Sequence, residues 1–246
     1  MPKYYKVNDH LDLKLNSNEI ITIELNSHDV TLNYDLQNAD YSILIFNNFN
    51  NDINLIESGS IINSNVNITY IDLNNYKFNQ NNSINVYSNS TLNINSIYLG
   101  INTKEITFDL TNKEKDSKVY INNNVVCLND ADFVLNVIGN IVKGAKRSIC
   151  KQKSNCLTFE SPKRSKILPV LNIDENDVEA AHALSSGTID EEVLFYMNSR
   201  GLTKKESLSL LLMSYLLPND EFYSIYENGK HIKNEANKKV NDLCLM

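Results

Sequence analysis

Two residues in this sequence have side chains that can bind a metal ion, Cys156 and His182. Cys156 ends the stretch "KQKSNC", and Cys150 lies directly before it, so both cysteines have basic neighbours. Nearby positive charge favours the thiolate, which is the form of cysteine that binds metal or attacks sulfur. The spacing alone does not rank Cys156 above Cys150.

His182 lies between Ala181 and Ala183, where the last predicted strand gives way to a predicted helical region. Small neighbours leave its imidazole accessible, and a neutral imidazole binds iron, copper or zinc and can also carry a proton. The alternative is that His182 only satisfies backbone groups at the junction. A thiolate and an imidazole form part of an iron-sulfur ligand set, so further ligands would come from a second subunit or from exogenous thiols.

The sequence assigns no role to the other cysteines and histidines. The four cysteines show neither a CxxC pair nor zinc-finger spacing, and in a reducing compartment we expect free thiols: Cys127, Cys150, Cys156 and Cys244. A buried free thiol behaves as a small hydrophobe. Solvent exposure is expected for the three histidines in polar surroundings, which are His10, His28 and His231.

The elements that must position these residues fall into two groups. From about residue 19 to about residue 171, runs such as "IITIELN", "VTLNYDL" and "EITFDL" place an apolar residue at every second position, which predicts strands with one buried face. The clusters "NNFNND", "NQNN" and "TNKEKDSK" predict turns between them. Such strands fit a sandwich, a barrel or a β-solenoid. We favour the solenoid because small polar side chains can stack from coil to coil, although no fixed repeat length is visible.

Helical signals begin near residue 188. The sequence Thr188-Ile189-Asp190-Glu191 matches a capping box, which predicts a helix that begins there and ends at Gly201. Asp190, Glu191 and Glu192 are read as capping and dipole residues rather than as a carboxylate site. The expected apolar stripe of this helix is Ile189, Val193, Tyr196 and Met197.

Two further helices are predicted after Gly201. Thr203 and Glu206 form a second capping box before "SLSLLLMSYLL", which stops at Pro218. Asn219 caps a third, amphipathic segment that is expected to be interrupted at Asn228-Gly229. The apolar run must be buried on most of its circumference, either on the strand domain or against another protein.

These patterns divide the 246 residues into a short amino-terminal segment (1–18), a β core (19–178) and a helical domain (179–246). With 42% hydrophobic and 22% charged residues and a net charge of -7, the chain is not disordered and is not expected to bind nucleic acid. We find no secretion signal and no apolar run long enough to span a membrane, so a cytoplasmic location is expected. GxGxxG, GKS or GKT, HExxH and GxSxG motifs are absent, so nucleotide hydrolysis, zinc proteolysis and serine esterase chemistry lack their usual parts.

One stretch resembles a known family. "LPVLNIDENDVEAAHALSSGTIDEEVLFYMNSRGL" contains a proline-led strand at 168–173, an acidic turn at 174–178, a histidine element at 182–185 and a helix at 189–201. In this order the elements resemble the SufB/SufD family, the scaffold proteins of the SUF iron-sulfur cluster assembly system. The next stretch, "LTKKESLSLLLMSYL", resembles the helix that follows in that family, so the resemblance covers residues 168–216.

The resemblance implies a right-handed parallel β-helix core and a helical carboxyl-terminal domain that docks an ABC-type ATPase, usually called SufC. It also implies that two family members dimerise through their β-helices and that an iron-sulfur cluster forms transiently at the interface. Matched by position, Cys156 and His182 are the implied ligands of that cluster. SufB-type members have glutamates on both sides of the histidine, whereas this chain has Ala181 and Ala183, which favours the SufD-type branch.

The leading hypothesis is a compact, non-enzymatic scaffold with three classes of partner: a SufC-like ABC ATPase, a second SufB/SufD-type protomer, and a cysteine desulfurase or sulfur carrier. In a homodimer, two copies of Cys156 and of His182 would meet at the shared site. The first alternative is an architectural SufD-type subunit that supports a separate SufB-type scaffold. The second is a β-helix carbohydrate-binding protein or lyase.

Overall fold

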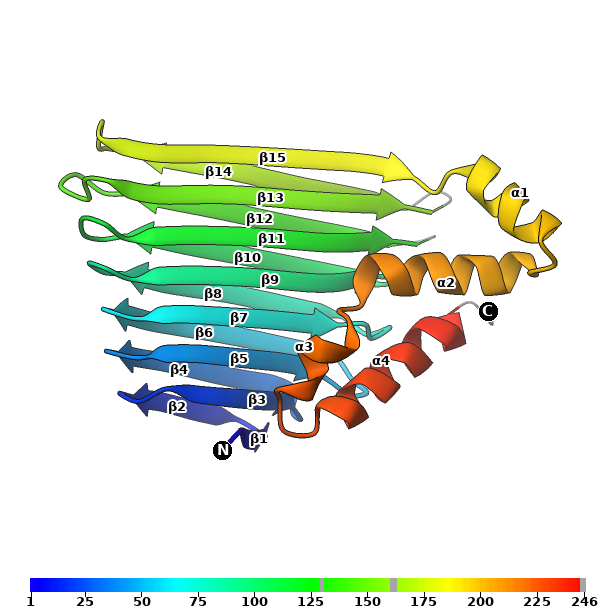
Figure 1. The fold of residues 1–246 in the computed structure, drawn as a ribbon, viewed down its shortest axis with the longest axis horizontal. Helices are drawn as coiled ribbons and strands as arrows, with labels where there is room; N and C mark the ends of the chain where they lie inside the picture. The colour runs from blue at the N-terminus through cyan, green and yellow to red at the C-terminus, as the bar shows by residue number, and fades with distance from the viewer. Residues whose placement is uncertain (129–130, 160–162, 244–246) are drawn as a thin grey trace.

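The computed structural model describes residues 1–128, 131–159 and 163–243, in which a parallel β-solenoid is followed by four helices (Figure 1). The strands of the solenoid are β1 (Lys3–Val7), β2 (His10–Leu15), β3 (Glu19–Leu25), β4 (Asp29–Gln37), β5 (Asp40–Asn47), β6 (Ile53–Ile62), β7 (Asn65–Asp72), β8 (Phe78–Val86), β9 (Thr91–Gly100), β10 (Thr103–Asn112), β11 (Lys118–Cys127), β12 (Asp132–Ile141), β13 (Ser148–Thr158), β14 (Arg164–Ile173) and β15 (Val178–Thr188).

Successive strands alternate between two sheets. Odd-numbered strands form one parallel sheet in the order β1 to β15, and even-numbered strands form the other from β2 to β14. Each strand therefore pairs with the strand two positions along the chain, which confirms the predicted β-solenoid.

The coils differ in length, which is why the sequence shows no fixed repeat. The paired residue lies 18 positions further on for Tyr4 and Thr22, 25 for Leu44 and Thr69, and 31 for Asn122 and Lys153. Because the number of residues per coil changes along the chain, the sequence has no single repeat period.

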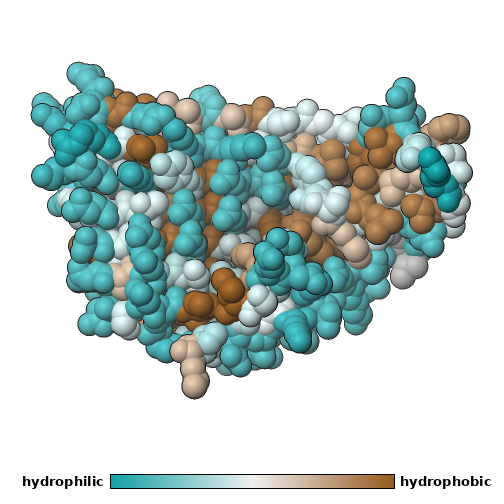
Figure 2. All heavy atoms as spheres, viewed as in Figure 1, coloured by the Kyte–Doolittle hydropathy of each residue, from teal (hydrophilic) through white to brown (hydrophobic). Residues whose placement is uncertain are grey.

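The predicted stacking of small polar side chains is confirmed. Asparagine side chains on the outer surface bond to the asparagine one coil away, as in Asn79 to Asn54 (3.1 Å) and Asn93 to Asn67 (3.0 Å). A further pair of this kind lies in the last coils, where Asn155 donates to Asn124 at 3.0 Å. Figure 2 shows hydrophilic residues in columns that run across the strands.

The predicted turn at "NQNN" is wrong, because residues 79–82 lie inside β8. Gln80 and Asn82 point into the solenoid and donate to the Glu57 carboxylate at 2.8 and 3.4 Å, and Tyr34 and Tyr70 donate to it at 2.6 and 3.1 Å. Burial raises the pKa of Glu57, and the four donors oppose that shift by stabilising its charge. Polar residues that bond inside a core look like a turn in the sequence.

The four helices are α1 (Glu191–Ser199), α2 (Lys204–Leu216), α3 (Asp220–Ser224) and α4 (Gly229–Leu243). The capping box at Thr203 is confirmed, as are the Asn219 cap and the positive φ of Gly201 (+96°). The break at Asn228-Gly229 is also confirmed, since α4 begins at Gly229.

The predicted start of α1 at Thr188 is wrong. Thr188 is the last residue of β15, and the cap is Asp190, whose carboxylate accepts from the Glu192 amide at 2.8 Å. The expected apolar stripe is not covered by the rest of the chain, because α1 buries only Leu194 and leaves Val193 and Tyr196 exposed. A strand that pairs along its full length extends to Thr188 before the helix can begin.

Helices α2, α3 and α4 pack on the outer face of the odd-numbered sheet, near the ends of its strands (Figure 1). Leu44 and Phe46 of β5 are buried against them, while the alternating Ile43 and Ile45 face the inside of the solenoid. The helical residues of this second core are Leu212, Leu216, Tyr223, Tyr226, Ile232, Ala236 and Val240. The apolar run of α2 therefore packs on the strand domain, one of the two outcomes predicted for it.

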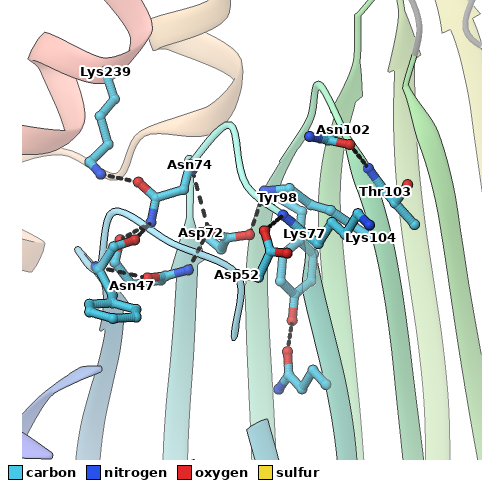
Figure 3. Close-up of polar contacts among 12 residues, drawn as sticks. Asn47, Asp52, Asp72, Asn74, Lys77, Tyr98, Asn102, Thr103, Lys104 and Lys239 are labelled. Carbon is cyan, nitrogen blue, oxygen red and sulfur yellow. Dashed lines mark hydrogen bonds and ion pairs between the residues drawn. The ribbon is translucent and has the colours of Figure 1, made fainter. Parts of the chain in front are cut away.

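Polar contacts also hold the helices to the solenoid. Thr22 of β3 donates to the carbonyl of Glu227 at 3.0 Å, and Lys239 of α4 donates to the side chain of Asn74 (Figure 3).

Strands β1 and β2 lie within the expected segment 1–18, and β15 runs past the expected boundary at residue 178. The division into three domains stays a prediction.

Candidate functional site

Cys156 lies in β13, near its carboxyl end, on the face that looks into the solenoid. Alternate residues of this strand, Cys150, Gln152 and Ser154, share that face and are buried. Cys156 is 4% exposed and accepts or donates a hydrogen bond with Ser165 of β14, with 3.3 Å between Sγ and Oγ. Because Ser165 is exposed, only the Ser165 side chain separates the Cys156 thiol from solvent.

His182 lies in the middle of β15 and not at a junction with a helix, so its expected position is corrected. It pairs in register with Gln152, and its side chain is exposed. Because Gln152 faces the interior, His182 occupies the same face of the sheet on the last strand. The face is open there because β15 ends the odd-numbered sheet.

The structure does not bring Cys156 and His182 together within one chain. Cys156 pairs in register with Ser186, which is four residues beyond His182 along β15. At a rise of about 3.3 Å per residue, this offset is roughly 13 Å. No single metal ion can bind both side chains of one protomer.

Cys127, which the sequence analysis left without a role, contacts Cys156. It is the last residue of β11 and lies diagonally beside Cys156, whose direct neighbour in register is Val125. The Cys127 thiol beside it lowers the pKa of Cys156, whereas Cys156 and burial raise the pKa of Cys127. Ser165, which bonds to Cys156, favours the charged form of both thiols.

Cys150 is a contrasting case. It is 1% exposed, and burial raises its pKa to about 12. It packs closely against Gly139, where an added Cβ would lie 2.5 Å from its sulfur. Cys150 is therefore an inert packing residue, and Cys156 is the better candidate for a metal ligand.

The other sequence candidates lie away from this end of the solenoid or outside the described part of the chain. His10, His28 and His231 are exposed, as expected, and His10 contacts Asp12 at 2.8 Å. Cys244 lies outside the described residues. Within those residues, no group of three or more His, Cys, Asp and Glu side chains is placed to hold a metal ion.

The last coil ends the solenoid with two unpaired sheet edges. β14 ends one sheet and β15 ends the other, and both are exposed along most of their length. The large apolar side chains exposed on these strands are Leu168, Val170, Ile173 and Leu184. A long exposed edge with apolar side chains is a surface on which another strand can pair.

Helix α1 lies beyond the carboxyl end of β15, to the side of the last coils, and is largely uncovered (Figure 1). Phe195 is 75% exposed and Tyr196 is 58% exposed. Beside them is an open groove of about 970 Å³, whose lining includes Phe159, Ile189 and Leu194. Figure 2 shows apolar residues gathered at the helical end of the molecule.

Comparison with known proteins places this architecture in a family. Residues 25–215 match the family described as "SUF system FeS cluster assembly, SufBD core domain". The chain belongs to the SufB/SufD family. The SufD name recurs among similar proteins: iron-sulfur cluster assembly protein SufD of Bacillus subtilis is 35% identical over 119 residues, which are 48% of this chain and 27% of that protein. SufD of Escherichia coli is 24% identical over 131 residues, covering 52% of this chain and 30% of that protein.

A third similar protein, an iron-sulfur cluster assembly SufBD family protein of Mycobacterium tuberculosis, is 33% identical over 76 residues, which are 31% of this chain and 9% of that protein. The chain thus spans less than a third of the length of these SufB/SufD relatives. In the described part of the chain, no helix is both long and apolar enough to cross a membrane.

Proposed function

We propose that this SufB/SufD protein is a non-enzymatic scaffold subunit on which an iron-sulfur cluster is assembled, with the cluster as transient cargo. The observation that carries the proposal is the position of Cys156, a thiol of lowered pKa one side chain from solvent at the open end of the solenoid. The match of residues 25–215 to the cluster-assembly family supports the proposal. Cluster sulfur would come from a cysteine desulfurase or a sulfur carrier.

The second protomer binds at the last coil. β14 and β15 offer two sheet edges of ten and eleven residues. Exposed Leu168 and Val170 on one edge and Leu184 on the other would be buried by a copy of the same surface. A two-fold axis makes such an interface self-complementary, which is the usual arrangement for a dimer.

The register of β15 makes this arrangement chemically useful. In an antiparallel pair of β15 strands centred on Leu184, His182 of one protomer lies opposite Ser186 of the other. Ser186 is the residue that pairs with Cys156 within its own chain. His182 of one protomer therefore lies level with Cys156 of the partner subunit, without the four-residue offset found within one chain. The two residues are separated by two strand spacings, roughly 10 Å. A cluster would lie between that thiolate and that imidazole.

The ABC-type ATPase docks on the helical region. Phe195 and Tyr196 of α1 form an exposed apolar surface, and surfaces of this kind mark protein interaction sites. The helix follows β15 after only two residues, Ile189 and Asp190. Movement of α1 by a bound ATPase would therefore act directly on the strand that carries His182.

Anaerobic reconstitution with iron and sulfide tests the ligand assignment. Cys156→Ser and His182→Ala are expected to lose most of the visible cluster absorption, whereas Cys150→Ser keeps it because that thiol is buried and inert. Size-exclusion chromatography with light scattering follows the dimer in each sample. Undiminished cluster content in both ligand variants would contradict the assignment.

Copurification with an ABC-type ATPase tests the docking surface. Phe195→Asp is expected to abolish the complex because it places a charge in the apolar surface of α1. Tyr76→Asp is the matched control, since Tyr76 is also an exposed aromatic residue, 38% exposed, but belongs to the loop after β7. Equal binding by both variants would rule out docking on α1.

The second candidate is an architectural SufD-type subunit that supports a separate cluster-bearing scaffold. Two observations favour it: Ala181 and Ala183 leave His182 without carboxylates beside it in β15, and two of the similar proteins are named SufD. If a SufB-type protomer is present, cluster content should then depend on a cysteine of that protomer and be insensitive to Cys156→Ser.

A further inference from the structure

The inside of the solenoid holds a group of side chains at the carboxyl ends of β11 and β13 that no sequence motif indicates. Cys127 lies diagonally beside Cys156 on the inner face of the solenoid, and Ser165 from the opposite sheet bonds to Cys156 at 3.3 Å. Cys127 is 0% exposed and Cys156 is 4% exposed, while Ser165 is exposed. Three potential ligand atoms therefore converge below the surface with one side open to solvent.

We propose that Cys127, Cys156 and Ser165 form a binding site for a single thiophilic divalent metal ion within one protomer. The identity of the physiological ion as Fe²⁺ rests on the proposed function in cluster assembly, but the site itself does not. Both thiols lose their protons when the ion binds, and the protons pass to solvent. Cys127, rather than His182, is then the second protein ligand that Cys156 has in its own chain.

The spacing of the atoms suits an ion. Around a tetrahedral zinc-like ion, with metal–sulfur bonds of about 2.3 Å and metal–oxygen bonds of about 2.1 Å, a sulfur and an oxygen ligand lie about 3.6 Å apart. The Cys156 sulfur and the Ser165 oxygen are 3.3 Å apart, so the site needs to open by only a few tenths of an ångström. Thiolates select soft metals such as Fe²⁺ in iron-sulfur chemistry or Zn²⁺ over Mg²⁺ and Ca²⁺.

The backbone spacing disfavours a disulfide as the alternative. Cys127 pairs in register with Thr158, which is two residues beyond Cys156. For strands about 4.8 Å apart that rise about 3.3 Å per residue, the two Cα atoms are about 8 Å apart. Disulfides need Cα atoms within about 7 Å, whereas an ion between the sulfurs spans the longer gap.

The neighbouring Cys156 and burial raise the pKa of Cys127, and the ammonium group of Lys104 only partly opposes that shift. Lys104 is itself paired with Asp72. The bound ion must therefore displace the proton of Cys127. Gly100, the register neighbour of Cys127, leaves room beside the sulfur, where an added Cβ would lie 3.3 Å away. With three ligands from the chain, a fourth position stays open toward solvent, which is typical of sites that exchange their metal or its ligands.

Anaerobic titration of the reduced full chain with Co²⁺ alone tests the site, because thiolate-to-cobalt charge-transfer absorption reports the number of bound thiolates. The wild type is expected to bind one Co²⁺ with two thiolates. Cys127→Ser and Cys156→Ser should each halve the absorption per bound ion and weaken binding by at least about tenfold, since loss of a mere outer-shell partner already costs about 10–100-fold. Cys150→Ser is the matched buried-thiol control and should bind like the wild type.

A variant that lacks a buried cysteine can fail to fold, so Ser165→Ala provides a second test of the metal site. Ser165 is exposed, and its substitution should leave the fold intact. It should weaken Co²⁺ binding while leaving the charge-transfer absorption per ion unchanged. Full two-thiolate binding by Cys127→Ser would overturn the proposal, and so would a wild type that binds no Co²⁺ when reduced but forms a Cys127–Cys156 disulfide on mild oxidation.

His182→Ala separates this inference from the proposed function. It should leave Co²⁺ binding by the single chain unchanged even where it abolishes cluster assembly. If the chain binds Co²⁺ but forms no dimer, cluster or ATPase complex, the metal site is supported and the scaffold function is contradicted. If it assembles a cluster but does not bind Co²⁺ as a single chain, only the metal site is contradicted.

Discussion

Lys104 of β10 forms an ion pair with Asp72 of β7 inside the solenoid, across its two sheets (Figure 3). The two side chains are 0% and 3% exposed, so both charges are almost fully removed from water. Asp72 also accepts from the side chain of Asn47 at 2.9 Å, and it lies beside Asn74, which contacts Lys239 of α4. The pair thus links both sheets to the helical region.

Removing one partner of this pair should be strongly destabilising. Asp72→Ala leaves the Lys104 ammonium buried and unpaired, and breaking such a pair costs about 3–5 kcal/mol. Urea unfolding measures the change. Asp132→Ala is the control, because Asp132 pairs with Arg164 at the surface, where solvent screens the interaction. Equal stability of the two variants would show that the buried pair has no special weight.

A side chain at Gly59 should strain the solenoid. An added Cβ would lie 2.6 Å from the Cβ of Tyr34 and 2.9 Å from its carbonyl oxygen, so the backbone of β4 or β6 must move. Gly59→Ala is expected to lower the free energy of unfolding by about 1–3 kcal/mol. Gly187→Ala, where the Cβ meets nothing within 4 Å, should change it little. An unchanged free energy of unfolding in Gly59→Ala would show that β4 and β6 can move apart without destabilising the fold.

The cap of α1 separates the structure from the capping box read in the sequence. Asp190→Ala removes the acceptor for the Glu192 amide and should destabilise α1 by about 1 kcal/mol. Amide hydrogen exchange in residues 191–194 reports this as faster exchange. Thr188→Ala should leave that exchange unchanged, because Thr188 belongs to β15. The opposite ranking of the two variants would restore the Thr188 cap.

The start of α2 should weaken in acid. The Thr203 backbone amide donates to the Glu206 carboxylate at 2.7 Å, and this bond lowers the pKa of Glu206 from 4.5. The stabilisation is fully present above the unfolded-state pKa of about 4.5 and is lost as pH falls through the lower folded-state pKa.

Amide exchange in the first turn of α2 between pH 6 and pH 3, corrected for intrinsic rates, measures the loss. Glu206→Gln keeps a side-chain acceptor but has no charge to titrate, so its exchange should not show this transition. An identical pH response in both proteins would assign the effect to another group.

The sequence by itself determined the elements that follow a simple rule. Alternating runs such as "EITFDL" became strands, because one face of each is buried and the other solvated. Thr203 with Glu206, Asn219 and Gly201 marked helix ends correctly, since capping involves residues within one turn. The ordered elements in residues 168–216 indicated the SufB/SufD family, and the family match confirms it.

Strands with polar residues on their inner face were harder to read. β13 carries Cys150, Gln152, Ser154 and Cys156 inward, and β6 carries Glu57 and Gly59, so neither alternates clearly in hydropathy. Their partners lie on other coils, as for Gln80 and Glu57, which are 23 positions apart. No local pattern records such a bond.

Only the tertiary structure decided which of these side chains lie close together. The sequence nominated Cys156 and His182, but the register of β13 and β15 sets them four residues apart. The same stacking brings Cys127 against Cys156, although 29 positions separate them and the coil there advances by 31. Because coil length varies along the solenoid, proximity between coils follows from backbone pairing across the sheet and not from any spacing along the chain.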